Sequence, residues 1–595
     1  MTCASWFRNV ELLETFEMSW SSMSMEAAGA GSAPVASMSR PPRNTIDMKA
    51  TSVPDCFARE RPRPFAWRRL ASGAAICIAA LLACSCRHSV STGTADTLVF
   101  GRNKDALNLD PALAQDGLSL SLDEVMLEGL TRYRPGSFNI EPGLATSWKV
   151  DGTGRTWTFT LRRNVKFQDG TSFDAGAVKF NIDRWRLRDS PYHKYGIFTY
   201  YQSQFGGFPG IIAAVQVLAP DKIVLHLSHP MAPLLANLAE PAFAMSSPTA
   251  IRAHGADYFR RPIGTGPYAL SEWIKDDHIT LRRFDGYWGP KPRITTVVVR
   301  DFPDPAVTRL ALENGDIDGW EFPRPDDVAA LSGNANMRVY QRPPNSTMYL
   351  AINTQRPALN DVRVRRAINE AIDARTITQR LFERGTVRAK SFLPPTVWPR
   401  GVPTAYRYDP PDAKRLLREA GYPHGFKTRL WYMTAPRPYL PQPERVAEAI
   451  QADLKAVGID AALQGLEWGT FLHRVMNAEH DLTLAGWTGD NGDPDNFLYP
   501  PLDLDNAHPP GAYNLAFWRN AAYHRLIVAA QSTLPIHERA RLYVQALRLI
   551  HEDAPVVPIA YPTTAVVFST RVAGVVPAPD GSEMFQHLHF KRDGD

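Results

Sequence analysis

The positions of the cysteines constrain this chain more than any other feature. All five lie within the first 86 residues: Cys3, Cys56, Cys77, Cys84 and Cys86. The chain beyond residue 86 can therefore form neither a disulfide nor a thiolate metal site, so apolar cores must hold it together. A hydrophobic content of 44% over 595 residues is ample for several domains of this kind.

The segment around the last cysteines has the features of an export signal. A basic stretch from Arg61 to Arg69 precedes an apolar run from Ala71 to Ala83. That run is too short for a resident membrane helix but suits the core of a secretory signal. Its end, Leu81-Leu82-Ala83-Cys84, resembles the bacterial lipobox, so we expect Cys84 to be lipidated, with Cys86 as the weaker candidate. An ordinary signal with incidental cysteines is the alternative.

The flanking residues complete the expected N-terminal organisation. Residues 1–47, rich in Ser, Met, Pro and Ala, are interpreted as a disordered leader or as sequence before the true start. Residues 48–83 are the expected lipoprotein signal, beginning at Met48, and residues 84–95 a Ser/Thr-rich tether.

Beyond the tether, strand and helix periodicities intermix. Residues 155–170 predict a half-buried β-hairpin closed by an Asp169-Gly170 turn, and residues 294–302 predict a buried strand. One amphipathic helix is expected to begin near Asp361, and another to run from Pro443 to a stop at Gly458.

A third helix is expected over residues 536–550, with Leu542, Ala546 and Leu549 facing inward. The mixture of strands and helices shows no repeat period, which favours an α/β fold.

Charge and motifs argue against several functions. The formal net charge of +5 is small for this length and indicates no nucleic-acid partner. The sequence contains no G-x-S-x-G, H-E-x-x-H, Walker A, C-x-x-C or G-x-G-x-x-G motif, so we assign no catalytic residue, metal ligand or cofactor. His587 and His589 lie two apart on an expected strand but lack a third ligand.

Eight segments occur in an order that resembles a known family. They are IEPGLATSWKV, RTWTFTLRRNVKFQDGTSF, PIGTGPYAL, FDGYWGPKP, LENGDIDG, LNDVRVRRAINEAID, MTAPRPYLPQPERVAEAIQADLKAVGI and AGWTGDNGDPDNF. Together they resemble the large periplasmic solute-binding proteins of ABC importers for peptides and nickel, and most closely the dipeptide-binding proteins. The resemblance covers about residues 96 to 595.

This resemblance implies a two-lobed α/β periplasmic-binding-protein fold, with the ligand between lobes joined by two chain crossings. By analogy, lobe I comprises residues 96–343 and 561–595, with an extra subdomain at about 131–240. Lobe II comprises residues 344–560. The crossings are expected near RPPNSTMYLAIN and VVPIAYP.

The resemblance also assigns binding residues. A dipeptide carries an ammonium and a carboxylate at a nearly fixed separation, and burying both requires a partner for each. The family pattern gives the ammonium to Asp490 of WTGD and the carboxylate to Arg437 of RPY, whose planar guanidinium suits it. Trp468 of EWG is expected to lie against the ligand. The remaining lining residues are expected to be Tyr439, Trp487, Thr488 and Gly489.

Each assignment has a structural alternative. Asp490 could cap the Asn491-Gly492 turn, Arg437 could be a surface residue before a proline, and Trp468 could be core. Asp493 and Asp495 are expected to be turn and cap residues around Pro494. A calcium loop is disfavoured there, because Pro494 stiffens the segment and no distal Glu follows.

The expected function is that of a substrate-binding lipoprotein, a monomer held in the periplasm, that delivers dipeptides or short peptides to ABC permease subunits in the cytoplasmic membrane. Within the same class, haem, a peptide antibiotic, an opine or nickel remain alternative ligands. An exported peptide hydrolase is the alternative from another class, and a chemoreceptor is an alternative partner.

Overall fold

The structure, a computed structural model, describes residues 96–114, 116–399, 402 and 405–592. The expected signal, the tether and Cys84 lie outside these residues. Among the described helices, none combines the length and apolar character needed to cross a bilayer.

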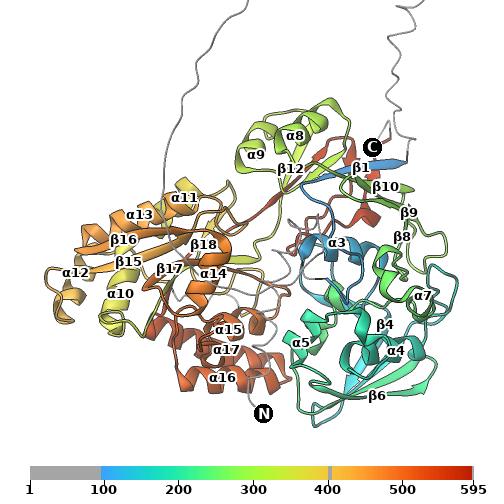
Figure 1. The fold of residues 1–595 in the computed structure, drawn as a ribbon, viewed down its shortest axis with the longest axis horizontal. Helices are drawn as coiled ribbons and strands as arrows, with labels where there is room; N and C mark the ends of the chain where they lie inside the picture. Colours follow the sequence, from blue (N-terminus) through green and yellow to red (C-terminus); the bar gives the residue numbers. More distant parts are fainter. Residues whose placement is uncertain (1–95, 115, 400–401, 403–404, 593–595) are drawn as a thin grey trace, which may run out of the picture. The chain divides into compact units, whose positions relative to one another are not determined.

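A seven-stranded sheet contains strands from both ends of the described chain (Figure 1). Its spatial order is β12 (Met337–Gln341), β19 (Ala565–Ser569), β11 (Gly319–Glu321), β1 (Thr97–Arg102), β10 (Thr296–Asp301), β9 (His278–Arg283) and β8 (Tyr268–Ile274). β1 runs parallel to β10 and β11.

A six-stranded sheet is the second large sheet. Its order is β14 (Val387–Arg388), β18 (Val556–Tyr561), β13 (Ser346–Ile352), β17 (Leu482–Thr488), β15 (Phe426–Met433) and β16 (Ile459–Leu466). β15 runs parallel to both β16 and β17. The chain passes from one large sheet to the other twice, over residues 342–345 and 562–564.

The remaining strands are antiparallel. A four-stranded sheet has the order β4 (Ala145–Val150), β5 (Thr156–Leu161), β7 (Lys222–Leu227) and β6 (Ile212–Ala219). Two pairs are β2 (Thr131–Tyr133) with β3 (Ile140–Pro142), and β20 (Val572–Ala573) with β21 (His589–Phe590).

Helices cover the sheets. They are α3 (Gly117–Met126), α4 (Ala175–Arg186), α5 (Thr199–Phe205), α6 (Leu234–Asn237), α7 (Pro248–His254), α8 (Pro305–Asn314), α9 (Pro325–Leu331), α10 (Val362–Ala371), α11 (Ala374–Leu381), α12 (Pro410–Glu419), α13 (Pro443–Ala456), α14 (Trp468–Met476), α15 (Pro494–Leu502), α16 (Ala521–Ser532) and α17 (Ile536–Asp553). Short 3-10 helices are η3 (His193–Tyr195), η4 (Pro241–Phe243), η5 (Gly255–Arg260), η6 (Leu504–Asn506) and η7 (Phe585–His587).

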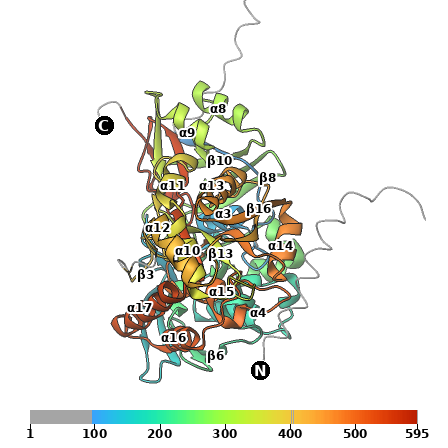
Figure 2. The ribbon, with the colours of Figure 1, turned by 90° about the vertical axis from the view of Figure 1, so that its left-hand side faces the viewer.

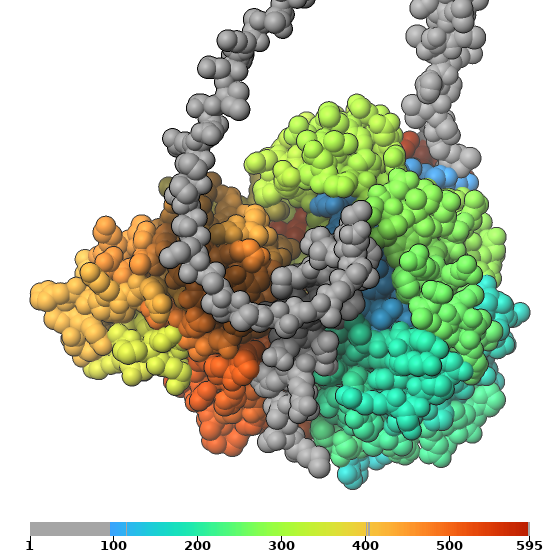
Figure 3. Space-filling view, viewed as in Figure 1, coloured from blue at the N-terminus to red at the C-terminus, as the bar shows by residue number. Residues whose placement is uncertain are grey.

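Apolar side chains pack the helices against the sheets. Helices α10 to α13 share one core with the six-stranded sheet, and Figure 2 shows α10, α11 and α12 on the side facing the viewer. Helices α8 and α9 pack on the seven-stranded sheet through Leu312, Leu331 and Trp320, and their yellow-green segment forms part of the surface seen in Figure 3. On α8, Val307 and Leu310 are exposed.

Local sequence signals predict the start of α10 and both ends of α13 correctly. Asp361 caps α10 by accepting a hydrogen bond from the Arg363 N–H, and Pro443 opens α13, which ends before Gly458 at a φ of 98°. The expected helix from Asp361 is, however, two helices, because α10 ends at Ala371 and α11 begins at Ala374.

Two predictions need correction. The Asp169-Gly170 turn exists, but it joins Val165–Phe167 to Thr171–Phe173, while β5 pairs with β4 and β7 instead. In α17, Ala546 is buried as predicted, but Leu542 and Leu549 are only partly buried. The buried face of α17 instead contains Arg539 and Tyr543, which hydrogen-bond each other at 2.9 Å, together with Ala546, Leu547 and Ile550.

Candidate functional site

The residues predicted to bind a ligand follow the carboxyl ends of three neighbouring strands. Arg437 and Tyr439 follow β15, Trp468 follows β16, and Asp490 follows β17. Because β16, β15 and β17 are adjacent and parallel, their carboxyl ends meet at one edge of the six-stranded sheet. Ligands in open α/β sheets characteristically bind at this edge.

Both chain crossings meet the six-stranded sheet at the same edge: the first ends there and the second begins there. Ser346, the first residue of β13, pairs with Thr488, the last residue of β17. β18 runs antiparallel to β13, so its last residue, Tyr561, also lies at this edge. The predicted binding segments therefore lie beside the connections between the two large sheets.

Arg437 and Trp468 are in direct contact. The guanidinium carbon lies 3.6 Å from the Trp468 ring centroid. Two backbone hydrogen bonds between Arg437 and Leu440, of 3.0 and 2.8 Å, hold the arginine in a tight turn. Its Nε is buried without a hydrogen-bond partner, and no described carboxylate forms an ion pair with it. The guanidinium is thus oriented and available for an anion.

Tyr439 lies against the backbone of β17. A Cβ built on Gly486 would lie 2.2 Å from Tyr439 Cδ2, so only glycine permits this packing. Burial raises the pKa of Tyr439 to about 12, although Arg437 opposes the shift, and the phenol therefore stays neutral.

The end of β17 is fixed by the first crossing. The side-chain amide of Asn345 donates a hydrogen bond of 2.6 Å to the Gly489 carbonyl. In return, the Gly489 N–H donates one of 3.0 Å to the backbone carbonyl of Asn345. The hydroxyls of Ser346 and Thr488 are 2.9 Å apart. The half-buried Trp487 contacts Tyr513 edge to face, with ring centroids 6.3 Å apart.

Asp490 is solvent-exposed and has no cationic partner among the described residues. Its side chain does not cap the Asn491-Gly492 turn. It accepts a hydrogen bond from Asn496 Nδ2 at 3.0 Å, and its backbone N–H donates to Asn496 Oδ1 at 3.0 Å. Desolvation by the surrounding protein raises the pKa of Asp490, and the Asn496 hydrogen bond partly offsets that shift.

The structure adds an acid that sequence reasoning missed. Glu240 is almost fully buried and accepts hydrogen bonds from Asn491 and Gln204, both at 2.6 Å. Burial and, second, the charge of Asp490 raise the pKa of Glu240 well above its usual value. Glu240 and Asn491 are 251 residues apart, and no motif in the sequence marks their contact.

Asp493 is a cap, as predicted. Its side chain accepts the Asp495 N–H at 2.9 Å at the start of α15, and its two oxygens bind the Arg539 guanidinium at 2.5 and 2.6 Å. The groups of side chains whose spacing suits a metal ion, among the described residues, include neither Asp490 nor Asp493.

Comparisons with known proteins identify the family of this chain. Residues 139–508 match the family described as bacterial extracellular solute-binding proteins, family 5 Middle. The chain is 34% identical over 517 residues to the dipeptide-binding protein of Escherichia coli K12, covering 84% of this chain and 95% of that protein. It is 32% identical over 530 residues to heme-binding protein A of Haemophilus influenzae, covering 85% and 96%.

Solved structures support the same conclusion. The ABC transporter-associated periplasmic binding protein DppA from Helicobacter pylori, in complex with the peptide STSA, superimposes with a TM-score of 0.69 at 32% identity. The match covers 83% of this chain and 98% of that one. The two-lobed α/β fold predicted from the sequence is confirmed.

Proposed function

This chain belongs to family 5 of the bacterial extracellular solute-binding proteins, and we propose that it binds dipeptides by their two charged ends. The supporting observation is a pair of opposite charges, each without a salt bridge to another described residue. Asp490 offers a carboxylate and Arg437 a guanidinium at the same sheet edge, and neither has an ionic partner among the described residues.

Two opposite charges at this edge suit a short zwitterion. An unpaired buried charge is costly, so each end of the ligand needs its own partner. Asp490 lies four residues beyond Gly486, and four residues of chain span at most about 14 Å. Gly486 also contacts Tyr439, two residues from Arg437, so the segments that carry the two charges lie side by side, as binding of a short ligand requires.

The backbone at this edge supports selection by length rather than by side chain. Asn345 fixes the Gly489 carbonyl, and Tyr439 packs on Gly486, so the end of β17 is held rigidly beside both charges. The two charges recognise groups that every dipeptide carries. Longer peptides would move one terminus away from its partner.

We further propose that the protein delivers its ligand to an ABC permease in the cytoplasmic membrane, as a periplasmic monomer anchored through Cys84. The curated relatives are named as binding proteins, which supports this role. The anchor rests on the sequence alone, and mass spectrometry of the mature N-terminus would test it.

Haem is the competing ligand that the relatives suggest, since one of them is named a heme-binding protein. Haem carries two carboxylates and no ammonium. Arg437 could pair with a propionate, but Asp490 would face a ligand without a cation. The free carboxylate therefore favours the zwitterion.

The test is calorimetry of the purified protein with a dipeptide, the corresponding tripeptide and haem. We expect tight binding of the dipeptide, weaker binding of the tripeptide and no saturable binding of haem. Tight haem binding with no dipeptide signal would refute the proposal. Recovery of the bound dipeptide intact by mass spectrometry would argue against the hydrolase alternative.

A further inference from the structure

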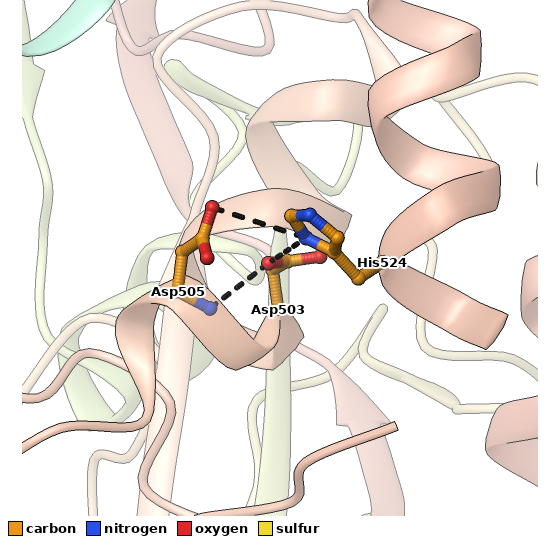
Figure 4. A group of neighbouring side chains, drawn as sticks. All are labelled: Asp503, Asp505 and His524. Atoms are coloured by element: carbon orange, nitrogen blue, oxygen red, sulfur yellow. Dashed lines mark hydrogen bonds and ion pairs between the residues drawn. The ribbon is translucent and has the colours of Figure 1, made fainter. Parts of the chain in front are cut away.

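Asp503, Asp505 and His524 form a cluster at the C-terminal end of α15, whereas Asp490 precedes the N-terminal end of this helix. Asp503 ends α15, Asp505 lies in η6, and His524 lies in the first turn of α16. One ligand atom from each residue lies within 4.8 Å of the others. Figure 4 shows the His524 ring directed toward both carboxylates.

The distances place one nitrogen between two acids. His524 Nδ1 lies 2.9 Å from Asp503 Oδ1 and 3.8 Å from Asp505 Oδ2. The Asp505 N–H also donates to Asp503 Oδ1 at 3.0 Å, and the Tyr499 hydroxyl donates to Asp505 Oδ2 at 3.2 Å. These hydrogen bonds orient the carboxylates, as outer-shell hydrogen bonds orient the ligands of metal sites.

A buried oxygen in this cluster lacks a partner. The Asp503 side chain is 0% exposed, and its Oδ2 has no hydrogen-bond partner. Such an unsatisfied buried group is rare and calls for an explanation. An ion pair with His524 alone leaves this oxygen unsatisfied.

The charges do not balance either. The described ion pairs of Asp503 and Asp505 involve His524 alone, so even a protonated imidazole leaves a net negative charge. A divalent cation beside a neutral imidazole would balance both carboxylates. The His524 and Asp505 side chains are 28% and 38% exposed, which leaves one side open for water ligands.

We propose that Asp503, Asp505 and His524 bind a zinc ion that joins the end of α15 to α16. One imidazole and two carboxylates are ligands that zinc accepts, with water completing a tetrahedron. Calcium and magnesium prefer all-oxygen sites, so the imidazole argues against them. The nine residues of α15 extend about 13 Å, so the ion would lie apart from Asp490.

Equilibrium dialysis of the chelator-treated protein against micromolar zinc tests this proposal. We expect one zinc per chain, lost in His524→Gln and in Asp505→Asn, with dipeptide affinity unchanged. His537→Gln is the matched control, because His537 is a 69% exposed histidine on α17 outside the cluster. It should bind zinc like the wild type.

Thermal unfolding provides a second readout. Zinc, which binds only the folded state, should raise the Tm of the wild type and of His537→Gln, whereas calcium should not. It should not raise the Tm of His524→Gln. Circular dichroism is the check that each variant is folded. Absence of saturable zinc binding, or a zinc content unchanged in His524→Gln, would overturn the proposal.

Discussion

Asp495 shows how one carboxylate couples the stability of this protein to pH. Burial, followed by the nearby charge of Asp493, raises the pKa of Asp495 to about 7, while Gln531 donates a hydrogen bond of 3.0 Å to it. Because the pKa is raised in the folded state, proton binding stabilises that state. This contribution is complete below the ordinary aspartate pKa, about 3.9, and is lost as the pH rises through about 7.

Asp495→Asn keeps an acceptor for Gln531 but cannot ionise. It should be more stable than the wild type by up to about 4 kcal/mol near pH 8, and no more stable near pH 4. Urea denaturation at both pH values measures the difference. A gain of equal size at both would show that ionisation of Asp495 is not its cause.

Also at the residue scale, short segments of sequence predict Arg437, Trp468 and Tyr439 as binding residues. The structure places Arg437 on Trp468 and Tyr439 on Gly486. Glu240 and Asn345 were missed, because their positions depend on contacts with residues 251 and 144 positions away. Such contacts arise from tertiary folding and leave no local pattern.

At the scale of elements, Asp493 links two helices. It caps α15 and forms a bidentate ion pair with Arg539 of α17, with side chains 7% and 5% exposed. Asp493→Asn preserves the cap, since Asn and Asp cap equally well, but leaves the arginine charge uncompensated. It should cost about 3–5 kcal/mol of stability, measured by urea denaturation.

Asp304→Asn is the matched control. Asp304 caps α8 in the same way, by accepting the Ala306 N–H at 2.8 Å, but it has no ion pair among the described residues. This substitution should change the stability little. Equal effects of the two substitutions would mean that the ion pair with Arg539 contributes nothing beyond the cap.

Helices and strands with boundary signals in the local sequence could be predicted, whereas strand partners that depend on tertiary pairing could not. Pro443 and Gly458 delimit α13 in both sequence and structure. The alternation of Trp157, Phe159 and Leu161 identified β5, and all three side chains are buried. Its pairing with β7 was missed, because β7 lies more than sixty residues further along the chain.

At the scale of the whole molecule, the order of motifs predicted the fold class better than it predicted contacts. The sheets of the two lobes are joined by residues 342–345 and 562–564, and the first crossing supplies Asn345 to the end of β17. The carboxyl ends of β15, β16 and β17 meet at this edge, so the segments that carry Asp490 and Arg437 are positioned by one sheet.

The most direct test of dipeptide binding is calorimetry of Asp490→Ala and Arg437→Ala with free and end-blocked dipeptides. Each substitution should weaken binding of the free dipeptide by about 3–5 kcal/mol, because one ligand charge is left unpaired. That corresponds to a loss of roughly a hundredfold to a few thousandfold. Asp490→Ala should barely affect an N-acetylated dipeptide, and Arg437→Ala should barely affect a C-amidated one. If both variants bind the free dipeptide as the wild type does, these residues do not hold its ends and the proposed site is wrong.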